Sequence, residues 1–489
     1  MIDQQIRRLA VAFLVLFILL FAQVNYIQVF AAKRLANDPA NQRQLLAEYN
    51  VRRGEILASD EKTVLAQSVP TKGIYKYLRV YPQGALYGSI TGFSSLFFGR
   101  SGLEASQNEF LSGSAPELLP QNLVDEILGR PKRGGTVVTT IDPKLQQAAA
   151  RALGALPGGV VALDPQTGNV LALVANPSFD PNPLASHDPK VARPFQRKLL
   201  SDPSRPLLSR AFQELFPPGS TFKMLTAAAA LQNGIKPSTL FPNPPELTLP
   251  QTTHKLQNFG GEHCLGGAPQ ITLAQAFQIS CNVVFGEVGL RLGAKALVEQ
   301  AEKFGFDQQV PFDIPWAEGS IPPVKDFANA LPAVAFSAIG QQSVGANPLQ
   351  MALVAAAIAH GGVEMAPRLV TEIRDPSGRV VKRFGPKEFG RPISAGTASA
   401  LTAMMVSVVD AGTGTAAQIP GIKVAGKTGT AQTPSGKPHA WFVCFAPAAN
   451  PRIVVAVVVL NGGSLGSDAT GGQVAAPIAK AVLQAALGG

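Results

Sequence analysis

FPPGSTFK, residues 216–223, opens a run that is apolar on almost every side and is expected to form a buried helix over 220–231. The two prolines and the glycine end the preceding segment, so the helix is predicted to begin at Ser220. Ser220 and Lys223 then share one helix face. Because burial lowers the pKa of a lysine, the pair predicts a general base beside a nucleophile. Taken alone, however, such a pair is more often a serine cap followed by a solvent-facing lysine.

Two polar side chains interrupt an apolar stretch further along the chain. Ser280 and Asn282 lie in ISCNVV, residues 279–284. A serine hydroxyl can pass on a proton, and an asparagine can hold a substrate amide. A helix or turn cap is the simpler interpretation of this triplet by itself.

A third polar cluster, VAGKTGTAQ at 424–432, is predicted to be a strand edge. Lys427 offers a fixed positive charge, and Thr428 and Thr430 offer hydroxyls. Gly429 lets a ligand approach the backbone closely. The group therefore suits the binding of a carboxylate and the alignment of an extended peptide.

The composition of the 489 residues excludes several classes of protein. Hydrophobic residues make up 46% and charged residues 15%, which excludes disorder as the main state. The net charge of +10 is dispersed, so no nucleic-acid partner is expected. Scattered histidines and three cysteines offer no metal-ligand spacing, and neither a metal nor a cofactor is predicted.

Residues 421–428 match the phosphate-binding pattern GxxxxGK[ST]. That pattern requires a helix directly after it, and no helix can begin in the GTAQTPSG that follows, so a nucleotide site is not expected here.

The N-terminus predicts the compartment. Residues 9–32 carry no charge and, at about 36 Å as a helix, are long enough to cross a ~30 Å hydrocarbon core. We therefore predict a cytoplasmic tail at 1–8 and a single-pass anchor at 9–32, with a cleaved signal peptide as the alternative. Basic residues flank both ends, so charge does not determine the orientation. The bulk of the chain is assigned to the outside of the cell membrane from its predicted chemistry.

An α+β fold in two units is expected after the anchor. Residues 33–155 contain no candidate chemistry and are predicted to be a non-catalytic pedestal, with strands over 73–81 and 136–140 and a helix capped by Asp142. Residues 156–489 are predicted to be a catalytic domain whose antiparallel sheet joins both ends of the segment around a helical middle. The expected strands are 160–163, 170–174, 440–446 and 453–460, and the expected helices are 220–231, 273–292, 348–360 and 473–487.

SxxK at Ser220, SxN at Ser280 and KTG at Lys427, in this order, resemble the motif set of penicillin-binding proteins and serine β-lactamases. RGEI at 53–56 and GLE at 102–104 resemble the N-terminal module of class B penicillin-binding proteins, and the nearest resemblance is to the actinobacterial penicillin-binding protein A group. This resemblance implies a monofunctional D,D-transpeptidase whose antiparallel sheet carries a helical subdomain.

Four residues carry the chemistry that the resemblance implies. Ser220 is the acylated nucleophile, and Lys223 is its general base. Ser280 relays a proton to the leaving amine. Lys427 supports the electrostatic field around Ser280.

The resemblance also implies residues that bind the substrate. Asn282 contacts substrate amides, and Thr428 and Thr430 bind the terminal carboxylate on either side of Gly429. The backbone N–H groups of Ser220 and Thr430 form the oxyanion hole.

The implied substrates are peptidoglycan stem peptides ending in D-Ala-D-Ala, and β-lactam antibiotics are implied as acylating agents. Only about 125 residues separate the anchor from the catalytic domain, too few for a glycosyltransferase domain as well as a pedestal, so a membrane-embedded glycan polymerase is the implied partner. Two alternatives stay open. One is a D,D-carboxypeptidase or β-lactamase, with water as the acceptor, and the other is a β-lactam-binding scaffold of the division machinery.

Cys264 and Cys281 lie 17 positions apart in the part of the chain assigned to the oxidising side of the membrane. A disulfide beside the active site is predicted, with two buried thiols as the alternative. Cys444 lies in an apolar strand and is expected to belong to the core.

Overall fold

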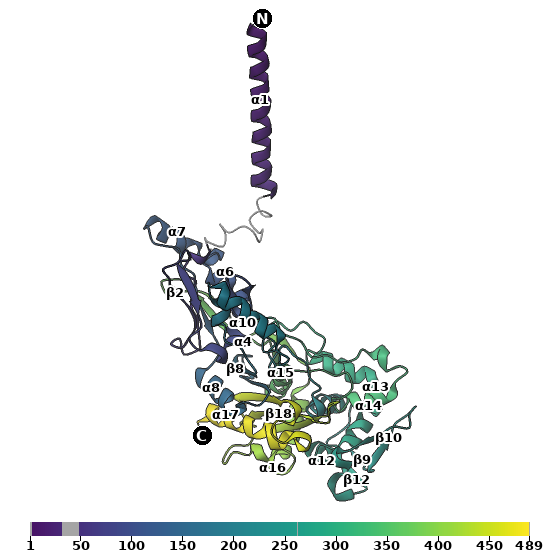
Figure 1. The fold of residues 1–489 in the computed structure, drawn as a ribbon. Helices are drawn as coiled ribbons and strands as arrows, with labels where there is room; N and C mark the ends of the chain where they lie inside the picture. The colour runs from purple at the N-terminus through teal and green to yellow at the C-terminus, as the bar shows by residue number, and fades with distance from the viewer. Residues whose placement is uncertain (1, 32–47, 262, 489) are drawn as a thin grey trace.

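The computed structural model describes residues 2–31, 48–261 and 263–488, so the predicted start of the pedestal at residue 33 lies outside the described residues. Figure 1 shows an N-terminal helix, then a smaller folded region around β2 and a larger one around β18.

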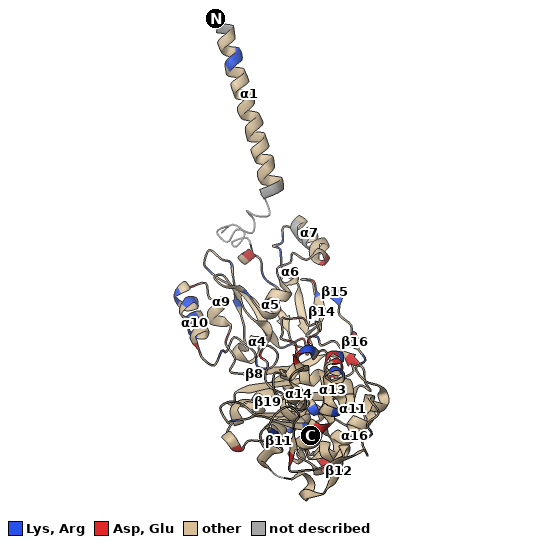
Figure 2. Ribbon diagram, turned by 90° about the vertical axis from the view of Figure 1, so that its right-hand side faces the viewer, with Lys and Arg blue, Asp and Glu red and all other residues tan. Residues whose placement is uncertain are grey.

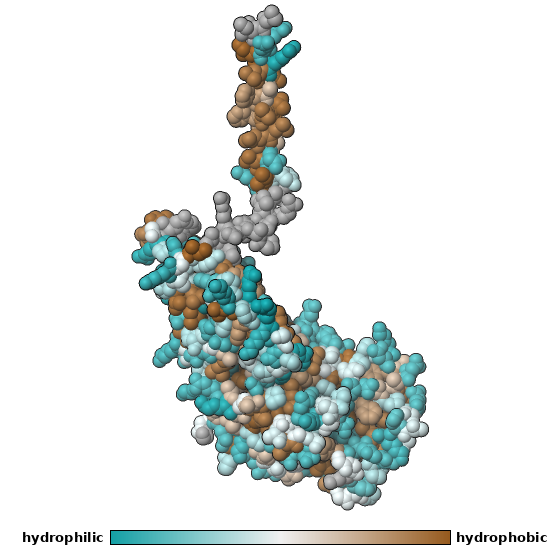
Figure 3. Space-filling model, in the orientation of Figure 1, coloured by the Kyte–Doolittle hydropathy of each residue, from teal (hydrophilic) through white to brown (hydrophobic). Residues whose placement is uncertain are grey.

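The N-terminal helix has the properties of a membrane anchor. Helix α1 (Ile2–Tyr26) begins before the predicted residue 9 and continues as a π-helical turn to Ala31. Among the described residues, it forms the one helix with the length and hydropathy of a membrane span. Its apolar side chains, such as that of Phe17, are exposed and form the brown column of Figure 3. In water this surface would be unfavourable, so a lipid environment is expected for it.

The larger region is built on a five-stranded antiparallel sheet. Its strand order is β17-β18-β19-β7-β8, so strands from both ends of the predicted catalytic domain are neighbours, as expected. The strands are β7 (Gly158–Leu163), β8 (Val170–Asn176), β17 (Ala425–Ala431), β18 (His439–Ala446) and β19 (Ile453–Val459).

Helices cover both faces of this sheet, which explains the uninterrupted apolar sequence of β19. Val454, Ala456 and Val458 belong to the core that includes α15 (Pro348–Ala359). The alternate residues of the strand belong to a second core with α8 (Pro143–Leu153) and α17 (Ala476–Leu487). Successive side chains of a strand point to opposite faces, so a central strand buried on both sides must be apolar throughout.

Helix α8 connects the two regions. It begins at Pro143 because the side chain of Asp142 accepts hydrogen bonds from the N–H groups of Lys144 and Leu145, as predicted for its cap. The predicted domain boundary at residue 155 placed this helix in the pedestal. Its apolar side nevertheless packs on α17 and on the five-stranded sheet, in the core of the catalytic region.

The smaller region contains a six-stranded sheet of order β15-β14-β6-β1-β2-β3. Two of its strands come from residues 370–383, which the sequence could not place there because they belong to the later part of the chain. The strand predicted over 73–81 is shorter, since only Tyr77–Val80 pair with β2 and the preceding residues form bends. The strands are β1 (Ile56–Leu57), β2 (Val64–Pro70), β3 (Tyr77–Val80), β6 (Thr136–Thr139), β14 (Val370–Arg374) and β15 (Val380–Arg383).

A buried ionic cluster holds this smaller region together. Glu104 is fully buried and accepts hydrogen bonds from Arg53 Nε at 2.6 Å, Arg79 Nε at 2.5 Å and the hydroxyl of Tyr81 at 3.2 Å. Burial alone would raise the pKa of Glu104, but the charges of Arg79 and Arg53 lower it below its usual value. The carboxylate is therefore ionised, and it pairs with two buried guanidinium groups.

Replacement of this carboxylate is predicted to destabilise the protein strongly. Glu104→Gln keeps the shape but removes the charge that pairs with two buried arginines and leaves Arg79 without a carboxylate partner among the described residues, which is expected to cost about 3–5 kcal/mol of unfolding free energy. Thermal or denaturant unfolding measures this loss. The matched control is Glu299→Gln, which removes an exposed carboxylate 3.8 Å from Lys295 and is expected to change the free energy by less than ~0.5 kcal/mol. Equal effects of the two substitutions would contradict the account.

Candidate active site

Ser220 lies on a tight turn at the start of a buried helix. Gly219–Phe222 form a 3-10 turn, and α11 (Lys223–Gln232) follows, so the predicted helix is confirmed with a modified first turn. Gly219 has a φ of +53°, which favours glycine. The indole N–H of Trp441 donates to the carbonyl of Pro217 at 2.9 Å and fixes the turn to β18. Ser220 opens into a cleft of about 1010 Å³.

Strand β17 passes unusually close to this turn. A Cβ at Gly429 would lie 2.9 Å from the carbonyl oxygen of Pro218 and 2.9 Å from Cγ2 of Thr221. Such distances are shorter than normal van der Waals contact, so a glycine is required at this position. The contact places the KTG segment beside Ser220.

The side chain of Lys223 is fully buried and extends from α11 to the SxN segment. Its Nζ donates to the carbonyl of Ser280 at 2.7 Å and to Oδ1 of Asn282 at 2.7 Å, and it lies 3.4 Å from Oγ of Ser280. Burial, and then the charge of Lys427, hold the pKa of Lys223 well below its usual range. A neutral amine has two N–H groups and one lone pair, so both short hydrogen bonds can form while the lone pair stays available as a base.

Ser280 is held at a break between two helices. The single helix predicted over 273–292 is wrong, because α12 (Leu273–Gln278) ends before the motif and α13 (Asn282–Lys303) begins within it. Ser280 adopts a φ of +62°, a left-handed conformation that a continuous helix excludes. The break turns the Ser280 hydroxyl toward both lysines of the site.

Lys427 approaches the same hydroxyl from β17. Its Nζ donates to Oγ of Ser280 at 2.8 Å and to the carbonyl of Thr428 at 3.0 Å. Burial lowers the pKa of Lys427 to about 7. Ser280 Oγ therefore lies between two buried amines, and it is the one side-chain oxygen within hydrogen-bond distance of both.

Among the described residues, no acidic side chain lines the cleft. No described carboxylate forms an ion pair with either lysine, and burial lowers both pKa values. An anionic group that enters the cleft meets an unbalanced positive charge. The site is therefore suited to a ligand with a carboxylate.

Two residues position the motifs, although sequence reasoning did not identify them. Oδ1 of Asn258 accepts from the N–H groups of Asn282 at 2.9 Å and Val283 at 3.2 Å, and so caps α13 from a neighbouring loop. The hydroxyls of Thr413 and Thr428 are 2.5 Å apart. Neither residue belongs to a recognisable motif, so only the fold reveals them.

The predicted substrate-binding residues meet at one side of the cleft. Asn282, Thr428 and Thr430 all line it, and Oγ1 of Thr430 accepts from the N–H of Gly471 at 3.4 Å. Asn282 has a second task that was not predicted, because its Oδ1 is occupied by Lys223. Its amide Nδ2, which donates to the carbonyl of Gln257 at 3.2 Å, is the group left to face a substrate.

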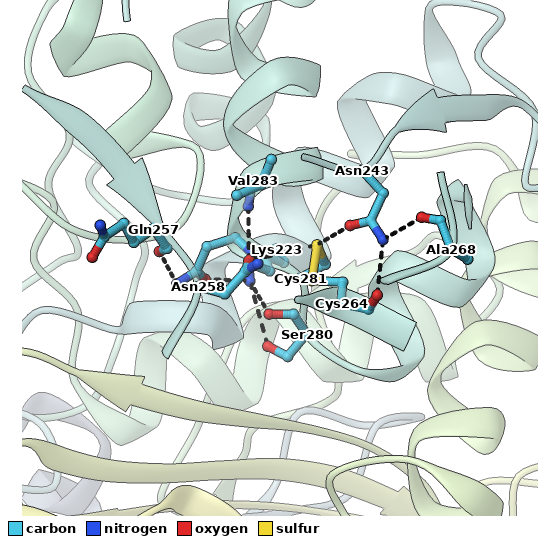
Figure 4. The surroundings of a disulfide bond; sticks show 10 residues. Lys223, Asn243, Gln257, Asn258, Cys264, Ala268, Ser280, Cys281 and Val283 are labelled. Carbon is cyan, nitrogen blue, oxygen red and sulfur yellow. Dashed lines mark hydrogen bonds between the residues drawn. A yellow bond between two sulfur atoms is a disulfide. The ribbon is translucent and has the colours of Figure 1, made fainter. Parts of the chain in front are cut away.

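The structure joins Cys264 and Cys281 by a disulfide with a Cα–Cα distance of 5.9 Å. Cys281 lies between Ser280 and Asn282, so the bond ties the SxN segment to the loop that carries Asn258 (Figure 4). Asn243 supports this loop by donating to the carbonyls of Cys264 and Ala268, each at 2.8 Å. Cys444 is a buried thiol of the core.

The fold and the three motifs define a serine acyltransferase site, and comparison with known families agrees. Residues 158–484 match the family described as penicillin binding protein transpeptidase domain, and residues 53–137 match the penicillin binding protein A dimerisation domain. The chain therefore belongs to the penicillin-binding protein transpeptidases.

Its similarity to individual relatives extends over the whole chain. It is 44% identical to the peptidoglycan D,D-transpeptidase PbpA of Mycolicibacterium smegmatis, over 99% of both chains. It is 42% identical to the protein of the same name from Mycobacterium tuberculosis, over 100% of this chain and 99% of that one. The acyl-enzyme complex of M. tuberculosis penicillin-binding protein A with ceftriaxone superimposes with a TM-score of 0.86 at 41% identity, covering 90% of this chain and all of that one.

The close approach at Gly429 generates a stability prediction. Gly429→Ala is expected to lower the unfolding free energy by about 1–3 kcal/mol, because the new methyl group displaces β17 from the Ser220 turn. Thermal unfolding measures the change. Gly385→Ala is the control, since nothing lies within 4 Å of a Cβ at that exposed glycine. A Gly429→Ala protein as stable as the control would show that the contact does not constrain the site.

Proposed function

We propose that this protein is a peptidoglycan D,D-transpeptidase that cross-links stem peptides through an acyl-enzyme on Ser220 and is acylated by β-lactams. The observation that carries this proposal is the Ser280 hydroxyl. It connects Lys223 and Lys427 at the floor of a cleft into which Ser220 opens. The family relationship supports the same chemistry.

In the acylation step, neutral Lys223 takes the proton of the Ser220 hydroxyl, and Oγ attacks the carbonyl carbon between the two terminal D-alanines. The tetrahedral oxyanion is stabilised by the backbone N–H groups of Ser220 and Thr430. Lys223 then carries the proton as an ammonium group, held by the oxygens of Ser280 and Asn282.

The leaving amine needs this proton for the peptide bond to break. It passes from Lys223 through Oγ of Ser280 to the nitrogen of the departing D-alanine. The charge of Lys427, 2.8 Å from that oxygen, favours the form of the hydroxyl that has given up its proton. The amine of a second stem peptide then attacks the ester, and the same groups act in reverse order.

Binding of the substrate carboxylate follows from the charge of the cleft. Thr428 and Thr430 offer hydroxyls beside Lys427, and none of the described lining residues is acidic. Gly429 keeps β17 close to Ser220, so an extended peptide beside this strand has its scissile bond near the nucleophile.

We further propose that α1 anchors the protein in the cell membrane with the catalytic domain outside. A membrane-embedded glycan polymerase is the proposed partner. It is contacted through the anchor and the pedestal, because these parts of the chain contain no candidate catalytic residues. Co-purification of the polymerase with full-length protein, and its loss on deletion of residues 1–137, which keeps α8 in the catalytic core, is the expected result. A complex that survives this deletion would place the contact in the catalytic domain.

The proposed activity is tested by intact-protein mass spectrometry after brief exposure to penicillin. We expect a stable adduct on the wild type, no adduct on Ser220→Ala, and an unchanged adduct on Ser435→Ala, which alters an exposed hydroxyl. If no adduct forms and the penicillin is hydrolysed, the protein is a hydrolase. If no adduct forms and the penicillin stays intact, the scaffold alternative is favoured.

The two lysines predict a bell-shaped pH profile for the second-order rate constant of penicillin acylation. The rising limb reflects loss of the proton from Lys223, whose pKa burial and the charge of Lys427 hold well below its usual range. Lys427, with its pKa lowered by burial to about 7, is charged below that pH and neutral above it, so the falling limb is expected near pH 7.

Arginine substitution separates the two limbs. In Lys427→Arg the guanidinium stays charged, so the falling limb is expected to disappear while the rising limb remains. Lys423→Arg is the control, because Lys423 is 70% exposed and pairs with Asp410 at the surface. If the falling limb persists in Lys427→Arg, Lys427 is not the group that titrates.

A further inference from the structure

Helix α10 (Pro189–Ser201) carries a cationic surface that the catalytic cleft does not use. Its N-cap is Asp188, whose side chain accepts the N–H of Lys190. One side of the helix packs down through Ala192, Phe195 and Leu199, of which Phe195 and Leu199 join a small apolar cluster with residues of the pedestal. Their spacing of three and four positions places them on one helix face.

The opposite face of α10 is basic, and the nearest acidic group that its charges act on is Asp202 at the end of the helix, through Lys198 and without an ion pair. Four cationic side chains lie within nine positions, and all of them are exposed: Lys190, Arg193, Arg197 and Lys198. The helix contains no acidic residue, and none of the four takes part in an ion pair with any part of the chain that the structure describes. Only Arg193 has a further contact, with its guanidinium 5.5 Å from the centre of the Phe97 ring.

The basic face of α10 differs from the surface of a helix that lies on a membrane. Figure 1 places α7 (Leu119–Ile127) at the upper end of the folded body, and Figure 2 shows the blue residues of α10 on its flank, below that end. The exposed apolar side chains of α10, Val191 and Leu200, lie at opposite margins of the basic face. They do not form the continuous apolar face with which an interfacial helix enters lipid.

We propose that this basic face binds a carboxylate-rich glycan–peptide polymer, which under the proposed function is the uncross-linked peptidoglycan strand itself. The inference rests on that function for the identity of the polymer. Lys190 and Lys198 are about 12 Å apart along the helix at ~1.5 Å per residue, so a row of charges faces outward. A polymer that repeats its carboxylates engages several of them at once. Each exposed pair is weak, but their sum retains a strand beside the enzyme while individual stem peptides exchange in the cleft.

The test uses the full-length protein in detergent and measures its co-sedimentation with purified peptidoglycan sacculi stripped of other anionic polymers. The variant replaces all four basic residues by glutamine: Lys190→Gln, Arg193→Gln, Arg197→Gln and Lys198→Gln. The matched control replaces four exposed lysines elsewhere that form no ion pair within the described part of the chain: Lys62→Gln, Lys236→Gln, Lys325→Gln and Lys387→Gln. Both proteins lose the same net charge.

We expect the α10 variant to bind sacculi about tenfold more weakly than the wild type, and the control to bind within about twofold of it. Amidation of the stem-peptide carboxylates is expected to weaken the wild type to the level of the variant. Equal binding by the variant and the control would overturn the proposal, as would undiminished binding to amidated sacculi. Binding that depends on α10 only with phosphatidylglycerol vesicles would assign the face to lipid instead.

Penicillin acylation and thermal unfolding are measured on the same samples. They show whether a negative result comes from the proposed function or from the proposed binding surface. Both variants are expected to be acylated at the wild-type rate, because neither set of substitutions touches the cleft. If the wild type is not acylated but its binding to sacculi depends on α10, the proposed function fails and the binding surface stands. If acylation is normal and binding does not depend on α10, the surface proposal fails alone.

Discussion

The active site depends on the burial of two lysine amines around one serine hydroxyl, with no carboxylate among the described residues paired to either amine. Lys223 and Lys427 come from different elements, and Ser280 Oγ lies within 3.4 Å and 2.8 Å of their Nζ atoms. Burial lowers the pKa of both amines, and the charge of Lys427 lowers the pKa of Lys223 further. In the proposed mechanism, Lys223 is thereby available as a neutral base for Ser220, and Lys427 supplies a positive field for an anionic ligand.

The surrounding structure maintains this arrangement through a break between two helices and a close contact between a strand and a turn. Ser280 occupies a left-handed conformation at a helix break, and the Cys264–Cys281 disulfide and Asn258 hold the two sides of that break together. Gly429 lets β17 pass within contact of the Ser220 turn. The five-stranded sheet, buried on both faces, is the rigid base to which these pieces are attached.

Much of this could be predicted from local patterns. The apolar runs of β7, β8, β18 and β19 identified the sheet, and the three motifs identified the residues that the fold brings together. The break at Ser280 was missed because the residues around it are apolar and continue a helical pattern. Asn258 and Thr413 were missed because their roles arise from contacts between segments distant in sequence. For the same reason, residues 370–383 could not be assigned to the pedestal sheet.

The protonation states of the two lysines are the central claim, and side-chain NMR tests them most directly. A pH titration of lysine Nζ nitrogens labelled with ¹⁵N, assigned with Lys223→Arg and Lys427→Arg, follows each amine separately. The account predicts that the pKa of each amine lies well below the usual range of a lysine, with that of Lys427 at about 7. Two amines that stay charged as long as the exposed ones would contradict it, because Lys223 would then have no lone pair with which to accept the proton of Ser220.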